Sequence, residues 1–138
     1  VWGRPPAGPG LATAIEEELP LGSVLVTDHA TPLRVLHASD RAPGAPPQDL
    51  LASTTMRRLM VEAAQTFDYV IVDTPPAGVV SDAAIIGRQV EATLLVARWN
   101  HTPAAALRAT AKSLTTARVP MAGLVLNDAD PARLPEYS

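Results

Sequence analysis

Apolar residues are grouped in short blocks along the second half of the chain. Largely apolar runs stand at residues 69–72, 93–97 and 122–126, and polar or turn-forming residues bound each of them. Runs of this length without alternation are typical of strands that are covered on both faces of a parallel sheet. The pattern therefore predicts three buried strands.

Segments with helical spacing separate these runs. Ser81 is a candidate N-cap for a helix over residues 82–89. Thr102 is a candidate cap for a second helix, with Pro103 at its first helical position. The second helix would turn four residues inward, namely Leu107, Thr110, Ala111 and Leu114. An order of strand, helix, strand, helix, strand leaves room for right-handed crossovers and predicts an α/β fold, a parallel sheet with flanking helices.

One longer helix is predicted in the first half of the chain, over residues 53–65 with Ser53 as its N-cap. Its expected buried face consists of Met56, Leu59, Met60, Ala63 and Ala64. Arg57 and Arg58 fall on the opposite face, where we expect them to be solvated.

Shorter elements are predicted ahead of this helix. They are a helix over residues 11–18 that stops before Pro20, a strand over 33–37 and a Pro-rich loop over 41–49. The loop is too short to mark a boundary between two domains.

Composition narrows the class of protein. The 138 residues suffice for one domain, and 47% hydrophobic with 18% charged residues indicates a folded chain. A net charge of -3 without a basic block, and an aromatic content of 4%, argue against nucleic-acid binding. The absence of cysteine excludes disulfides, Cys-zinc sites and thiol catalysis. No stretch is apolar enough to span a bilayer, so the expected location is the cytoplasm.

Asp73 is the strongest candidate for chemistry, because a carboxylate directly after a buried strand is held rigidly at the sheet edge. A phosphate-bound Mg²⁺ needs such an oxygen, directly or through a water. The alternative is a structural Asp that accepts backbone hydrogen bonds in the following turn. Other polar residues follow the next two strands, from Arg98 to Thr102 and at Asn127 and Asp128, and we expect all of them to line one edge. Arg98 there faces either phosphate or solvent.

The segment FDYVIVDTPPAGVVSDA, residues 67–83, resembles the Walker B region of the deviant P-loop ATPases. Within that group the chain is most similar to the bacterial tyrosine kinases of capsule and exopolysaccharide synthesis. The resemblance extends upstream through PPQDLLASTTMRRLMVEAAQ and downstream through SDAAIIGRQVEATLLVAR and AGLVLND.

This resemblance implies a P-loop NTPase-like fold and a function as part of an ATP-dependent protein tyrosine autokinase. It implies that Asp73 is the catalytic Walker B carboxylate, associated with Mg²⁺ through a water, and that Asn127 contacts the adenine of ATP. Tyr137 would be a phosphoacceptor near the carboxyl terminus. The implied partners are a membrane chain-length regulator of polysaccharide export and further copies of the chain, at the inner face of the cell membrane.

The P-loop itself has no counterpart in this sequence. No G-x-x-x-x-G-K-[ST] motif occurs, and the single lysine, Lys112, falls in a predicted helix. We therefore interpret residues 1–138 as a single partial kinase domain that runs from a preceding segment through Walker B onward, without the P-loop strand. Positioning and charge stabilisation dominate phosphoryl transfer, so we expect weak Mg-ATP binding and no kinase activity from the isolated chain.

Two alternatives stay open at this point. The first alternative to the kinase is part of a Min/Par-type ATPase, which shares Walker B and the strand order. The second is a non-catalytic interaction module that has lost its nucleotide site. The tail and residues 46–66 favour the kinase over the first alternative, whereas the missing lysine favours the second.

Overall fold

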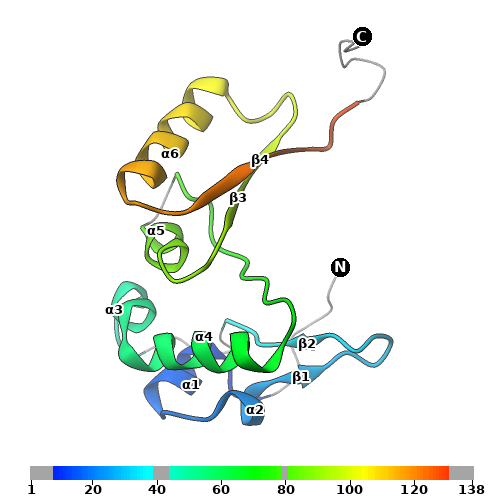
Figure 1. Ribbon diagram of the computed structural model, residues 1–138, viewed down its shortest axis with the longest axis vertical. Coiled ribbons are helices and arrows are strands. Elements are labelled where there is room, and N and C mark those ends of the chain that lie inside the picture. Colours follow the sequence, from blue (N-terminus) through cyan, green and yellow to red (C-terminus); the bar gives the residue numbers. More distant parts are fainter. Residues whose placement is uncertain (1–7, 39–43, 79–80, 131–138) are drawn as a thin grey trace. The chain divides into compact units, whose positions relative to one another are not determined.

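The structure, a computed structural model, describes residues 8–38, 44–78 and 81–130 (Figure 1). It divides the chain into two units, Val1–Asp73 and Thr74–Ser138. The first unit is mainly helical, and the second contains a small parallel sheet, so the chain is mixed α/β.

Four helices and one strand pair make up the described part of the first unit. In chain order they are α1 (Leu11–Glu16), α2 (Leu21–Val24), β1 (Val26–Thr27), β2 (Arg34–Val35), α3 (Pro47–Ala52) and α4 (Thr54–Thr66). The strands β1 and β2 pair antiparallel. A hydrophobic core joins α1, α2 and α4 through Ala14, Ile15, Leu21, Val24, Met56, Leu59 and Ala63.

Helix α4 confirms the longest helix that the sequence predicts. The Ser53 hydroxyl oxygen accepts a hydrogen bond from the Met56 amide at 3.0 Å, which satisfies one of the free donors of the first turn. Met56, Leu59 and Ala63 are buried as expected. Ala64 is exposed, so its assignment to the buried face was wrong.

The arginine face of α4 has a structural function at Arg58. Its Nη2 donates to the carbonyl oxygens of Glu18 at 3.3 Å and Leu19 at 3.2 Å, directly after α1. Glu62, one turn further along α4, accepts from the Leu21 amide at 3.4 Å. These polar contacts fix the turn between α1 and α2 against α4.

The second unit consists of two parallel strands with helices. Its elements are α5 (Asp82–Gly87), β3 (Thr93–Arg98), α6 (Ala104–Thr116) and β4 (Met121–Asn127). Strand β3 continues through α6 into β4, and the two strands pair in parallel, as the sequence predicts. Leu114 is the buried residue of α6, and the other three predicted inward positions are half-buried.

The predicted strand over residues 69–72 is absent. Tyr69 is 89% exposed and Ile71 is 94% exposed. A strand is stable only when its backbone groups pair with a neighbour, and in the described ranges pairing is limited to β1 with β2 and β3 with β4. The expectation of one three-stranded sheet was therefore wrong.

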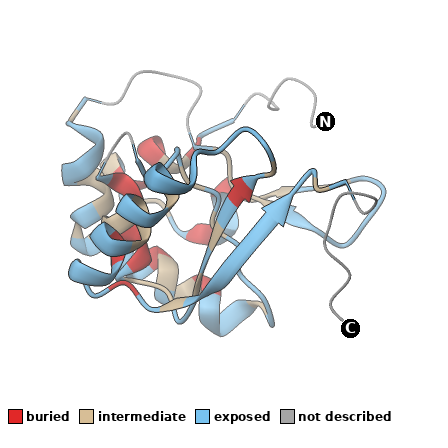
Figure 2. Ribbon diagram, turned by 90° about the horizontal axis from the view of Figure 1, so that it is seen from above, coloured by how far each residue is buried: buried red, intermediate tan, exposed pale blue. Residues whose placement is uncertain are grey.

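Strands β3 and β4 are also less covered than their apolar sequences predict (Figure 2). Ala97 is buried, but Leu94 and Val96 are each 60% exposed, and Leu124 and Leu126 in β4 are exposed too. A sheet of two strands presents two faces and two edges, and the described part of this unit does not cover them all.

Two short elements differ from the sequence prediction in the first unit. Helix α3 begins at Pro47, inside the predicted loop, because proline is well tolerated in a first helical turn. Strand β2 confirms the strand that is predicted over residues 33–37, although it is only two residues long. Its antiparallel partner β1 was not predicted from the sequence. Helix α1 confirms the predicted helix and ends at Glu16.

Candidate functional site

The carboxyl ends of β3 and β4 bring together two of the predicted site residues. Arg98 and Asn127 are direct partners in the parallel register. The Trp99 amide donates to the Asn127 carbonyl oxygen at 2.9 Å, so the pairing continues one residue past β3. The expectation that polar strand ends share one edge is thus confirmed for β3 and β4.

Arg98 forms an ion pair with Asp128. Its Nε and Nη2 lie 2.9 Å and 2.8 Å from Asp128 Oδ2, and the side chains are 59% and 58% exposed. Asp128 has a φ of 59°, in the left-handed region. The sequence predicts that Arg98 faces phosphate or solvent and does not predict this ion pair. The only indication of the pair is that Arg98 and Asp128 both stand at the ends of apolar runs that a parallel sheet would bring together.

A hydrogen bond between Arg98 and Thr102 closes the loop between β3 and α6. The Thr102 hydroxyl oxygen accepts from the Arg98 amide at 3.0 Å, and Pro103, which makes no side-chain cap, precedes α6. The prediction that Thr102 caps this helix was wrong, because its hydroxyl is used by the strand end. Asn100 has a φ of 56°, a conformation that asparagine tolerates better than most residues.

Asp73 is the last residue of the first unit, and it is exposed. Because residues 69–72 form no strand, the expectation that Asp73 is held rigidly at the end of a buried strand was wrong. In the ranges 8–38, 44–78 and 81–130, no group of three or more His, Cys, Asp or Glu side chains could hold a metal ion. A lone carboxylate fits Mg²⁺ that arrives with a nucleotide, because the phosphates and waters then supply the other ligands. It does not fit a site for free Mg²⁺.

The start of α5 contains a buried acidic residue. Asp82 begins α5 and is buried, and its Oδ1 has no hydrogen-bond partner among the described residues. Ser81, predicted as the cap of this helix, makes no side-chain cap hydrogen bond. Tyr137 lies outside the described residues.

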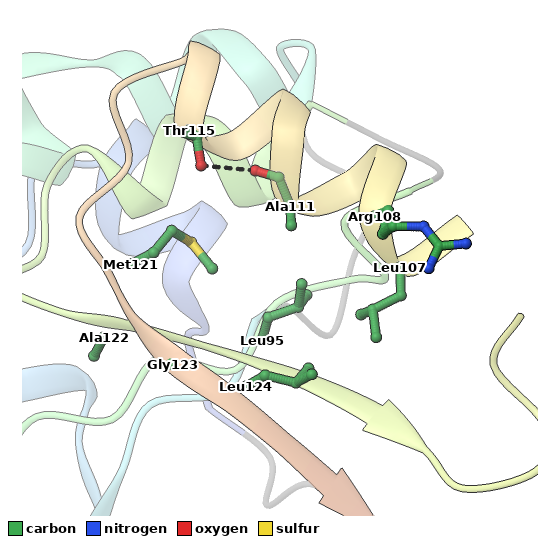
Figure 3. A pocket seen from close by; sticks show the side chains of 9 residues that line it. All are labelled: Leu95, Leu107, Arg108, Ala111, Thr115, Met121, Ala122, Gly123 and Leu124. Atoms are coloured by element: carbon green, nitrogen blue, oxygen red, sulfur yellow. Dashed lines mark hydrogen bonds between the residues drawn. The ribbon is translucent and has the colours of Figure 1, made fainter. Parts of the chain in front are cut away.

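An open apolar hollow of about 360 Å³ lies between α6 and the two strands. Figure 3 shows Leu107 and Ala111 from α6 and Leu95 from β3 along its walls. The Thr115 hydroxyl, at its upper end, donates to the Ala111 carbonyl oxygen at 2.9 Å and is thereby satisfied. Strands β3 and β4 border this hollow, but the predicted site residues at their ends, Arg98 and Asn127, do not line it.

Comparison with known proteins finds relatives that are tyrosine-protein kinases. No protein-family profile matches the chain. Tyrosine-protein kinase etk of Escherichia coli strain K12 is 43% identical over 81 residues, which cover 59% of this chain and 11% of that protein. Tyrosine-protein kinase ptk of Acinetobacter johnsonii is 32% identical over 120 residues, covering 87% of this chain and 16% of that protein.

Solved structures agree with these relatives. The kinase domain of Escherichia coli tyrosine kinase ETK matches 95% of this chain with a TM-score of 0.81 and 33% identity. The kinase domain of VpsO matches 90% of this chain with a TM-score of 0.80 and 25% identity. The chain spans 51% and 60% of these two solved chains, and a much smaller share of the curated relatives.

Proposed function

The chain is homologous to the bacterial tyrosine kinases and matches their kinase domain in fold, and from this we propose that it is part of a tyrosine autokinase that regulates polysaccharide export. The observation that carries the proposal is the structural match over 95% of the chain at 33% identity. The matched relatives bear the description of tyrosine kinases, which favours this function over a Min/Par-type ATPase.

Two residues are proposed to contact Mg-ATP. Asn127, exposed at the end of β4, would hydrogen-bond the adenine edge through its carboxamide, which both donates and accepts. Asp73 would hold Mg²⁺ through a water while the phosphates supply further ligands. The metal would neutralise charge on the transferred phosphoryl group, and the chain's own residues would orient the base and the ion.

The isolated chain is proposed to bind nucleotide weakly and to transfer no phosphate. Its sequence contains no P-loop motif, and Lys112 is exposed within α6, where its ammonium group cannot belong to a phosphate-binding loop. Backbone amides and a lysine normally carry the β- and γ-phosphates. We expect a dissociation constant for Mg-ATP well above the micromolar range.

The proposed context is a membrane-associated assembly. By resemblance, the chain would work with a membrane chain-length regulator and with copies of itself, at the inner face of the cell membrane, and Tyr137 would accept phosphate. No helix in the described ranges is long and apolar enough to cross a membrane.

An exchange of the chromosomal coding sequence for one with Asp73→Asn tests the function in cells. The kinase proposal expects loss of phosphotyrosine on this protein and a change in exported polysaccharide, with the protein level unchanged. Asp49→Asn, at an exposed position in α3, serves as the matched control. If Asp73→Asn leaves both readouts at the wild-type level, the chain acts as a non-catalytic interaction module.

A further inference from the structure

The ion pair between Arg98 and Asp128 lies beside Asn127 at the ends of β3 and β4, because Arg98 is paired with Asn127 across the strands and Asp128 follows it in the chain. We infer that Arg98 and Asp128 are positioning residues that fix the Asn127 carboxamide for the base of the nucleotide, and that Arg98 does not bind the phosphates. The inference rests on the proposed function, because it assigns a task to residues beside the proposed base contact.

The strand register places Arg98 and Asn127 on one face. Residues paired across two parallel strands project their side chains to the same side of the sheet, and Arg98 is paired with Asn127. The next residue of an extended strand would point to the opposite face. Asp128 instead adopts a φ of 59°, which turns the chain and allows its carboxylate to reach Arg98.

Contacts on both sides of Asn127 therefore limit its freedom. Its carbonyl oxygen accepts from the Trp99 amide at 2.9 Å, and the following residue is held by Arg98. The left-handed conformation is unfavourable for residues with a Cβ atom, although Asp tolerates it better than most. Loss of the ion pair would release Asp128 to other conformations and let the end of β4, with Asn127, move.

The same geometry argues against a phosphate contact by Arg98. A guanidinium binds phosphate best through a pair of N–H groups on one edge, and the Nε and Nη2 of Arg98 are both directed at Asp128 Oδ2. A phosphate at this edge would have to displace that carboxylate and would be repelled by its charge.

Adenosine and ADP as separate probes distinguish positioning of Asn127 for the base from phosphate binding by Arg98, because adenosine has the base and no phosphate. The isotope-labelled chain is titrated with each probe by NMR, as wild type and with Arg98→Gln, Asp128→Asn or both. Arg88→Gln, at an exposed arginine after α5, is the control. Circular dichroism and the amide spectrum establish that each variant is folded.

Positioning predicts that Arg98→Gln and Asp128→Asn weaken adenosine and ADP binding by the same factor, about two- to fivefold, the range expected for an exposed pair. The double variant should be no weaker than either single variant, because each change breaks the same contact. The Arg88→Gln control should bind both probes like wild type.

Three results would overturn the inference. If Arg98→Gln weakens only ADP and Asp128→Asn strengthens it, Arg98 is a phosphate ligand that Asp128 competes for. If the variants lower only the urea midpoint of unfolding and leave both dissociation constants unchanged, the pair is merely structural. If the wild type binds neither probe at Asn127, both the proposed nucleotide site and the positioning role of the ion pair are wrong.

Discussion

Gly87, the last residue of α5, lies against Val119 so closely that a Cβ atom on it would be 2.7 Å from the Val119 Cγ1 atom and 3.1 Å from Cγ2. Both residues are buried, at 5% exposure for Val119. The close approach of the end of α5 to Val119, two residues before β4, thus depends on a residue without a side chain.

Gly87→Ala should destabilise the chain by about 1–3 kcal/mol, because the extra methyl group forces this packed contact apart. Urea denaturation measures the change. Gly22→Ala is the matched control, since Gly22 is an exposed glycine in α2 with nothing within 4 Å of an added Cβ, and alanine favours a helix. A Gly87→Ala variant as stable as wild type would contradict the close packing.

Ser53→Ala should lower the free energy of unfolding by about 1 kcal/mol, because the hydroxyl that accepts from the Met56 amide is lost at the start of α4. Ser81→Ala should have a much smaller effect, since the Ser81 side chain caps nothing at the start of α5. Thermal unfolding of the two variants side by side checks the difference. A Ser53→Ala variant as stable as wild type would contradict a contribution of this cap to the stability of α4.

Arg58→Ala should destabilise the first unit by about 0.5–1.5 kcal/mol through loss of its hydrogen bonds to the Glu18 and Leu19 carbonyl oxygens. Arg57→Ala removes the same charge from the neighbouring exposed position, where no such contact is made in the described part of the chain. Amide hydrogen exchange at Leu21 and Val24 reports the loss locally. A matching effect of both variants would point to net charge as the cause.

Asp28 gives a prediction for acid pH. The Thr31 hydroxyl donates to Asp28 Oδ2 at 2.6 Å and, with nearby backbone amides, holds the pKa of this carboxyl below its ordinary value. A lowered pKa favours the folded state above the pKa of the unfolded chain, and this contribution disappears as the pH falls through the folded value. Thr31→Val should therefore raise the pKa of Asp28 in an NMR titration, and an unchanged pKa would exclude the hydroxyl as its cause.

Local signals predicted much of the fold. Helix α4 is predicted by its N-cap Ser53 and by the spacing of its own apolar residues. Strands β3 and β4 are predicted by two apolar runs, and α6 between them by the proline at its start. Residues 69–72 have an equally strong strand sequence, yet they are not paired in this structure. A single chain segment does not encode whether a neighbouring strand is present to satisfy its backbone.

The sequence indicates which polar residues end the strands, but it does not indicate the contacts between them. Arg98 and Asn127 stand out as polar residues that end apolar runs, and the parallel register brings them together. The pair of Arg98 with Asp128 depends on the left-handed turn at Asp128, which no hydrophobic pattern reveals.

Binding of ADP with and without Mg²⁺ tests whether this chain carries the Mg-nucleotide residues of a tyrosine kinase. NMR titrations of the wild-type chain and of Asp73→Asn, read at the amides of residues 73 and 127, give the four dissociation constants. If Asp73 holds the ion, Mg²⁺ strengthens ADP binding to the wild type, and Asp73→Asn abolishes this gain while the shifts at Asn127 persist. An equal gain in both proteins, or shifts at neither residue, would contradict it.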